Sequence, residues 1–156
     1  MSTTVRAARE VVLPPDEAER LWLDTGRWPT FIEGFAHVLE RDESWPDEGS
    51  KLVWESLPGG RGRVQEKVVS RDDGQLASRL VEDSMHGVQT VSFHPADGGG
   101  SIVELELRYD LHSTTIWRQG PLGALTNLLF IRRALTDSLI RTLRRFATEA
   151  AEERSL

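Results

Sequence analysis

The last third of the chain carries one long helical pattern, and it constrains the fold more than any other stretch. From Pro121 to about Glu153, apolar residues recur at intervals of three and four, and neither proline nor glycine follows Gly123. The apolar stripe consists of Leu125, Leu128, Leu129, Ile131, Leu135, Leu139, Leu143, Phe146 and Ala150. At about 1.5 Å per residue, the helix should be roughly 45 Å long. Its apolar face therefore needs a broad, curved partner surface.

The middle of the chain has the pattern of an antiparallel sheet. Short segments with strand character are separated by turn signals such as Pro58-Gly59-Gly60 and Asp72-Asp73-Gly74. The expected strands are residues 5–13, 36–44, 50–57, 62–71, 75–82, 86–94 and 101–112. From residue 36 onward the links are short, so consecutive strands should pair antiparallel rather than cross over in parallel.

Two short helices are expected between the first and second strands. Pro15, Asp16 and Glu17 suit a helix start, because acidic residues are favourable near the positive end of the helix dipole. This helix should run over residues 15–24, and residues 28–32 should form a second short helix or turn. The order strand, two short helices, six strands and long helix predicts an α+β domain over residues 1–156.

The last strand shows which face of the sheet should be covered. Apolar side chains alternate with polar ones along residues 103–112, so one face is dry and the other is wet. The dry set is Val103, Leu105, Leu107, Tyr109 and Leu111. The long C-terminal helix is the only expected element large enough to cover this face, so the seven-stranded sheet should wrap around it.

Composition and charge exclude several classes of function. The chain has no cysteine, which excludes disulfides, thiolate metal sites and a cysteine nucleophile. A net charge of −6 opposes binding to nucleic acid. The N-terminus lacks a signal-peptide pattern, and the most apolar run, residues 121–131, is too short for stable membrane insertion. We therefore expect a cytoplasmic protein.

Three local patterns resemble one family of proteins. Asp24-x-x-x-Trp28-Pro29-x-Phe31 follows the first helix, and Val64-x-Glu66-x-Val68 follows the turn at Pro58. Phe93-x-Pro95, the turn at Gly98–Gly100 and Ser101-x-Val103 form the third pattern. Together with the order of elements, these patterns resemble the SRPBCC superfamily, and within it the polyketide cyclase/dehydrase-like branch. The resemblance implies the helix-grip fold and a cavity between the sheet and the long helix.

Aromatic and apolar residues spread along the chain are the candidates to line such a cavity. The candidate ligand-binding residues are Trp28, Phe31, Trp54, Glu66, Phe93, Leu105, Leu107, Tyr109, Trp117, Leu125, Leu128 and Leu129. The same aromatic residues also suit plain core packing. Trp117 in the connector at residues 113–123, opposite Trp28 and Phe31, is expected at the cavity mouth. Glu66 is in phase with the inward residues Val64 and Val68, but a strand phase shifted by one residue would place it on the surface.

Three functions fit these residues. The best supported is binding of a hydrophobic small molecule in the internal cavity. An aromatase/cyclase is the alternative, with Glu66 or Tyr109 as weak candidates for proton transfer during ring closure. A stress or interaction module with a filled interior and no ligand is the third. Polar groups converging inside the cavity would favour chemistry, and a purely apolar lining would favour a carrier.

No metal or cofactor is expected. The four histidines lack the spacing of a helical zinc motif, and no Gly-x-Ser-x-Gly sequence marks a hydrolase nucleophile. The expected partner is a hydrophobic small molecule, and a homodimer is possible.

Overall fold

The computed structural model describes residues 2–112 and 120–156, and over this range it has the predicted helix-grip fold. The strands are β1 Thr3–Val11, β2 Phe35–Arg41, β3 Lys51–Ser56, β4 Arg63–Asp72, β5 Gln75–Val81, β6 Met85–Pro95 and β7 Ser101–Leu111. The helices are α1 Pro15–Leu23, the 3-10 turn Thr25–Arg27, α2 Trp28–Phe31, the 3-10 turn Asp97–Gly99 and α4 Gly120–Ser155. Every element expected from the sequence is present, with ends within three residues of those predicted.

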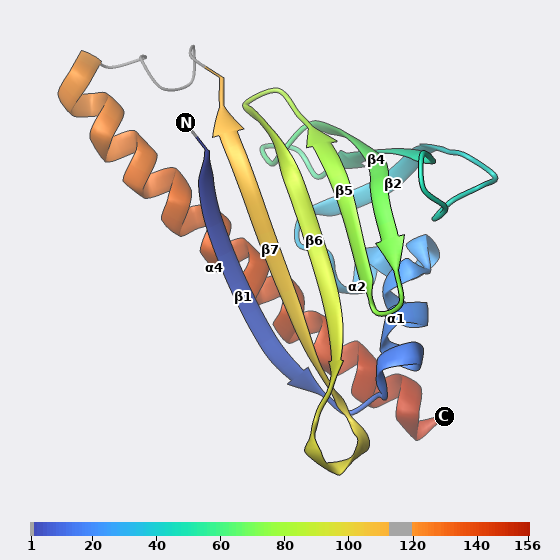
Figure 1. Cartoon of the computed structure of the whole chain (residues 1–156). Coiled ribbons are helices and arrows are strands. Elements are labelled where there is room, and N and C mark those ends of the chain that lie inside the picture. Colours follow the sequence, from blue (N-terminus) through green and yellow to red (C-terminus); the bar gives the residue numbers. More distant parts are fainter. Residues whose placement is uncertain (1, 113–119) are drawn as a thin grey trace.

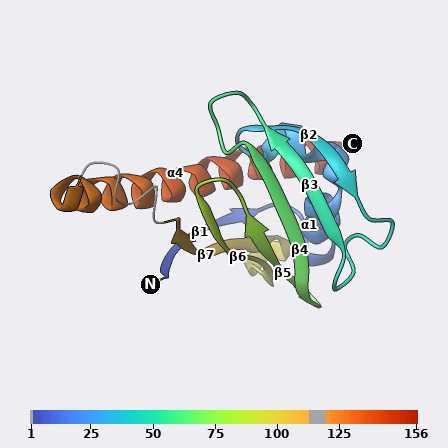
Figure 2. The same ribbon diagram turned by 90° about the horizontal axis from the view of Figure 1, so that it is seen from above.

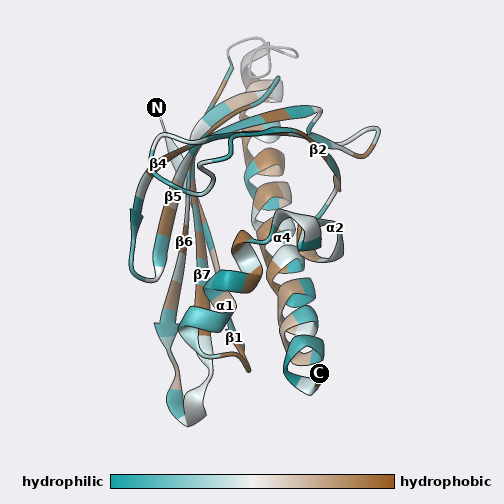
Figure 3. Cartoon of the chain, turned by 90° about the vertical axis from the view of Figure 1, so that its right-hand side faces the viewer, coloured by the Kyte–Doolittle hydropathy of each residue, from teal (hydrophilic) through white to brown (hydrophobic). Residues whose placement is uncertain are grey.

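The seven described strands form one antiparallel sheet in the order β1-β7-β6-β5-β4-β3-β2. Residues from β2 to β7 follow one another as a meander, and β1 closes the other edge against β7. Figure 1 shows α4 lying across one face of this sheet, and Figure 2 shows the sheet curving around the helix. The helices α1 and α2 lie beside the C-terminal half of α4 (Figures 1 and 3), where they complete the enclosure of the core.

The two short helices form where the local sequence favours them. Pro15 stands in the first turn of α1, where a proline nitrogen needs no hydrogen bond, and Asp16 and Glu17 lie near the positive end of the helix dipole. The apolar side of α1 buries Leu21 and Trp22. Trp28 in α2 is buried as well, and its indole N–H donates to the carbonyl of Trp22 at 2.7 Å. This bond fixes the two helices against each other.

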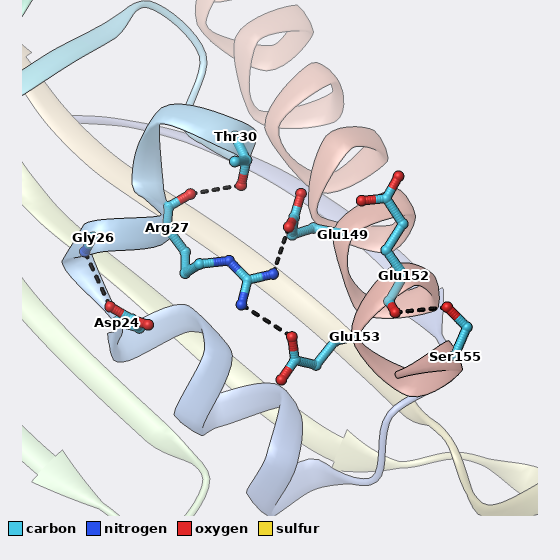
Figure 4. Close-up of polar contacts among 8 residues, drawn as sticks. All are labelled: Asp24, Gly26, Arg27, Thr30, Glu149, Glu152, Glu153 and Ser155. Atoms are coloured by element: carbon cyan, nitrogen blue, oxygen red, sulfur yellow. Dashed lines mark hydrogen bonds and ion pairs between the residues drawn. The ribbon is translucent and has the colours of Figure 1, made fainter.

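An ion-pair cluster fastens the connection between α1 and α2 to the end of α4 (Figure 4). The Arg27 guanidinium donates to Glu149 at 2.5 Å and to Glu153 at 3.0 Å. Thr30 in turn donates its hydroxyl to the carbonyl of Arg27 at 2.6 Å. Because Trp28 follows Arg27 directly, the cluster also holds Trp28 in place beneath α4.

The expected burial along the long helix is wrong for its first turns. Leu139, Leu143, Phe146 and Ala150 are buried against the sheet and the short helices. Leu125, Leu128 and Leu129 are exposed, at 58%, 37% and 61%. The reason is length: a helix of 36 residues is roughly 54 Å long, whereas a strand of 11 residues such as β7 spans roughly 37 Å. The helix therefore extends beyond the described sheet (Figures 1 and 2).

Candidate functional site

A narrow pocket lies between the concave face of the sheet and the middle of α4. Its apolar walls include Trp22, Trp28, Ile32, Trp54, Leu105 and Leu139, and its polar lining includes Glu33, Arg61, Glu66, Ser78, Gln89 and Thr142. The cavity volume is about 40 Å³. That space is enough for a few water molecules and falls well below the roughly 300–1,000 Å³ of most small-molecule sites. A larger ligand must push the walls apart.

Two polar contacts join Glu33, which lines the pocket, to α4. The backbone N–H of Glu33 donates to the Thr142 hydroxyl at 3.1 Å, and Arg141 forms an ion pair with the Glu33 carboxylate. Both side chains of that pair are partly exposed, so solvent screens the attraction. This ion pair therefore adds little to the stability of the contact between Glu33 and α4.

Glu66 faces the pocket from β4. It lies between the buried Val64 and Val68 on the inner face of the strand. This position decides the strand phase that the sequence left open. The indole N–H of Trp54, on the neighbouring strand β3, donates to Oε2 of Glu66 at 2.5 Å. Burial raises the pKa of Glu66, and the Trp54 hydrogen bond and the positive charge of Arg61 offset this only in part. Glu66 is thus biased toward its neutral acid form.

Arg61 forms the polar end of the pocket next to Glu66. Its guanidinium carbon lies 5.4 Å from the centre of the Trp54 ring, which is a cation–π distance. Its Nε donates to the buried Glu82 carboxylate at 2.6 Å. Its Nη2 is buried and, among the described residues, has no hydrogen-bond partner. A buried guanidinium N–H without an acceptor is costly unless something in the pocket supplies one.

The structure gathers only part of the predicted set of site residues. Trp28, Trp54, Glu66 and Leu105 line the pocket. Four others are buried in the core but do not line it, and these are Phe31, Phe93, Leu107 and Tyr109. Leu125, Leu128 and Leu129 lie on the exposed part of α4, and Trp117 lies outside the described residues.

Tyr109 does not converge with Glu66. It pairs with Thr3 of β1 in the sheet register, and Arg132 is the charged group that acts on it most. Burial raises the pKa of Tyr109. The groups that act on Glu66 are a different set, namely Trp54, Arg61 and Glu82. The polar group beside Glu66 in the pocket lining is therefore Arg61 rather than Tyr109.

A family model described as "Polyketide cyclase / dehydrase and lipid transport" matches residues 2–151. The chain belongs to this family. No curated protein matches it.

Solved structures show the same fold at low sequence identity. The di-domain ARO/CYC StfQ from the steffimycin biosynthetic pathway matches with a TM-score of 0.79 and 14% identity, over 100% of this chain and 53% of StfQ. The chain thus spans about half the length of StfQ. The Zhui aromatase/cyclase from a Streptomyces species matches with a TM-score of 0.74 and 15% identity, over 100% of this chain and 97% of Zhui.

A plant enzyme shares the fold as well. A point mutant of norcoclaurine synthase from Thalictrum flavum, in complex with a transition state analogue, has a TM-score of 0.65 and 12% identity. The match covers 99% of this chain and 97% of the plant enzyme. At such identities these likenesses establish the helix-grip fold of this family member, and the chemistry has to be argued from its own pocket.

One pocket residue of this family member, Arg61, and its ion-pair partner Glu82 have no signal in the sequence. Arg61 follows a glycine-rich turn, outside any periodic pattern, and Glu82 directly follows β5, 21 positions further on. The pairing of β4 with β5 brings the turn that carries Arg61 close to the end of β5. In the sequence, the position of Arg61 just before a strand with an inward-facing side is the one weak indication that it could reach the pocket.

Within the described residues, no group of three or more histidine, aspartate or glutamate side chains is placed to hold a metal ion. Likewise, none of the described helices combines the length and apolar character needed to cross a membrane.

We predict that Glu66 makes the stability of the protein depend on pH. Because burial raises the pKa of Glu66 above its ordinary value of 4.5, the folded state holds the Glu66 proton at pH values where the unfolded chain has lost it. The free energy of unfolding should therefore fall as pH rises from about 4.5 through the folded-state pKa, and stay constant above it. Denaturant unfolding at a series of pH values measures this slope.

Glu66→Gln is the matched variant, since it keeps the shape and the acceptor for Trp54 but cannot ionise. The difference between wild type and Glu66→Gln should appear only above pH 4.5, with the variant losing less stability there. A carboxyl NMR titration of Glu66 at its model-compound value, with the same pH slope in both proteins, would contradict the desolvated environment.

Proposed function

We propose that the protein binds a small hydrophobic molecule that carries an acceptor oxygen, such as a carbonyl or carboxylate. The observation that carries this proposal is the buried Nη2 of Arg61, a residue of the pocket lining, which has no acceptor among the described residues. The tryptophans and leucines of the walls suit an aromatic or aliphatic body. An oxygen placed at Arg61 would complete the hydrogen bonding of the guanidinium.

The size of the pocket limits the ligand and the manner of its binding. A cavity of about 40 Å³ must widen even for a single aromatic ring. The contact that should break at least cost is the exposed ion pair between Glu33 and Arg141. Binding should therefore separate this pair and expose Thr142, and the ligand should enter between α4 and the residues that follow α2, while α2 itself stays packed on Phe146.

A cyclase is the second candidate, and the pairing of Glu66 with Arg61 favours it. Aldol-type ring closure needs a group that stabilises a developing enolate oxygen and a group that exchanges a proton. Arg61 suits the first role. Glu66, whose pKa is raised by burial, suits the second. The family description and the aromatase/cyclase relatives of similar fold support this reading.

Matched pairs of ligands test the binding proposal. Acetophenone and ethylbenzene share the ring and a two-carbon side chain, and acetophenone adds the carbonyl oxygen that Arg61 could bind. The pair 2-acetylnaphthalene and 2-ethylnaphthalene repeats the comparison with two rings. Trp22, Trp28, Trp45 and Trp54 line the pocket, so quenching of tryptophan emission reports binding. We expect saturable binding at one site, with the ketone binding roughly 10-fold or more tightly, as a hydrogen bond to a charged group predicts.

Equal affinity for ketone and hydrocarbon would contradict the role of Arg61. Absence of saturable binding for every compound, with the protein folded and shown by native mass spectrometry to hold no ligand, would contradict the pocket itself. The cyclase reading is tested separately, because it requires turnover of a poly-β-ketone substrate that Glu66→Gln abolishes without loss of binding.

A further inference from the structure

The first turns of α4 expose an unusual set of large apolar side chains. Leu122, Leu125, Leu129 and Phe130 are exposed at 85%, 58%, 61% and 71%. We call these four residues the helix tip. They lie within three turns of one helix, so they form one contiguous surface rather than scattered exposed positions. None of the described elements covers them.

The helix tip is apolar on more than one side. Leu122 and Leu129 lie seven positions apart on one side of the helix, and the buried Ala124 lies on the opposite side. Phe130, one position after Leu129, lies on a third side of the helix. A helix with apolar side chains around most of its circumference is normally enclosed. Figures 1 and 2 show instead that this end of α4 projects past the sheet.

The charge around the helix tip differs from that of the chain as a whole. The protein has 25 acidic residues and a net charge of −6. Residues 120–136 contain no aspartate or glutamate, and they contain the two arginines Arg132 and Arg133. Both arginines lie within three positions of Phe130 and are exposed. An apolar surface bordered by cations matches a surface that is apolar inside and negatively charged at its boundary.

We propose that the helix tip docks on the surface of a membrane that contains anionic lipid. The four apolar side chains would lie at the boundary between headgroups and acyl chains, and Arg132 and Arg133 would contact lipid phosphates. The acidic remainder of the protein is repelled by such a surface, so only the projecting end should touch it. This attachment is peripheral, and it does not depend on which molecule the pocket binds.

A second copy of the chain fits the helix tip less well. A twofold contact would bring the same surface of both copies together. That surface would carry Arg132 and Arg133 of both copies, and positions 120–136 offer no acidic residue to pair with them. The charge pattern therefore favours a partner of opposite charge.

Vesicle sedimentation with the full chain tests the proposal. Large unilamellar vesicles of phosphatidylcholine alone are compared with vesicles containing about one third phosphatidylglycerol, at low and at physiological salt. We expect binding to the anionic vesicles that weakens as salt rises, and at least tenfold weaker binding to the neutral ones. Leu129→Glu should reduce the partition coefficient on anionic vesicles by tenfold or more, because it places a negative charge in the inserted surface.

Ile102→Glu on β7 is the matched control. Ile102 is 41% exposed and lies on the sheet, away from the helix tip, so the same added charge should change vesicle binding less than twofold. Equal losses for the two variants, or no binding to either kind of vesicle, would overturn the proposal. Analytical ultracentrifugation tests whether a second copy of the chain covers the helix tip instead. A dimer that Leu129→Glu dissociates, without vesicle binding by the wild type, would assign the helix tip to a second copy.

Discussion

Replacing Phe146 with alanine should lower the free energy of unfolding by about 3–5 kcal/mol, the range for truncating a fully buried phenylalanine. Phe146 has no exposed surface, and its ring lies 5.3 Å from that of Trp22 and 5.0 Å from that of Phe31, centre to centre. It is therefore the point where α4 meets both short helices. Removing the ring leaves a cavity that three separate elements must collapse to fill. Urea unfolding followed by tryptophan fluorescence measures the loss.

The matched control for this prediction lies on the same helix. Phe130 is 71% exposed, so Phe130→Ala should change the free energy of unfolding by no more than about 0.5 kcal/mol. The two variants remove the same atoms from the same kind of element and differ only in what surrounds the ring. Equal losses of stability for both would contradict the packing of α4 described here.

Much of the fold could be predicted because its causes are local. Alternation along β7 shows which side chains point inward, and intervals of three and four show the face of α4. These periodicities show which side chains point toward the core, but not how far along the helix the sheet extends. Leu125 and Leu129 continue the stripe of Leu139 and Phe146 without interruption in the sequence, and they are exposed because α4 is longer than the strands beneath it.

The pocket could be predicted less well, because its polar groups meet through tertiary contacts. Glu66 could be recognised as a candidate from the alternation of β4, and the structure supplied the inward orientation that the sequence left open. Arg61 and Glu82 follow no period, and their ion pair depends on how the turn before β4 folds against the end of β5. Tyr109 has the inward phase that was predicted, but it lies along β7 at a level that the pocket does not reach.

Arg61→Met should have two large effects that arise from different partners of the same side chain. The Glu82 side chain is only 4% exposed and receives a hydrogen bond from Arg61. Without Arg61, a buried carboxylate loses its ion-pair partner, which should cost about 3 kcal/mol of stability. The preference for acetophenone over ethylbenzene should also disappear, because the methionine thioether cannot donate a hydrogen bond to the ketone.

The double variant Arg61→Met with Glu82→Gln separates the two effects. Glutamine at position 82 is neutral, so it should restore most of the stability that Arg61→Met removes. It should not restore the preference for the ketone, since that preference depends on the guanidinium alone. Wild-type discrimination between ketone and hydrocarbon in the double variant would show that another group binds the oxygen. Glu66 would then be the candidate, because in its neutral form the carboxyl group is the next hydrogen-bond donor along the same end of the pocket.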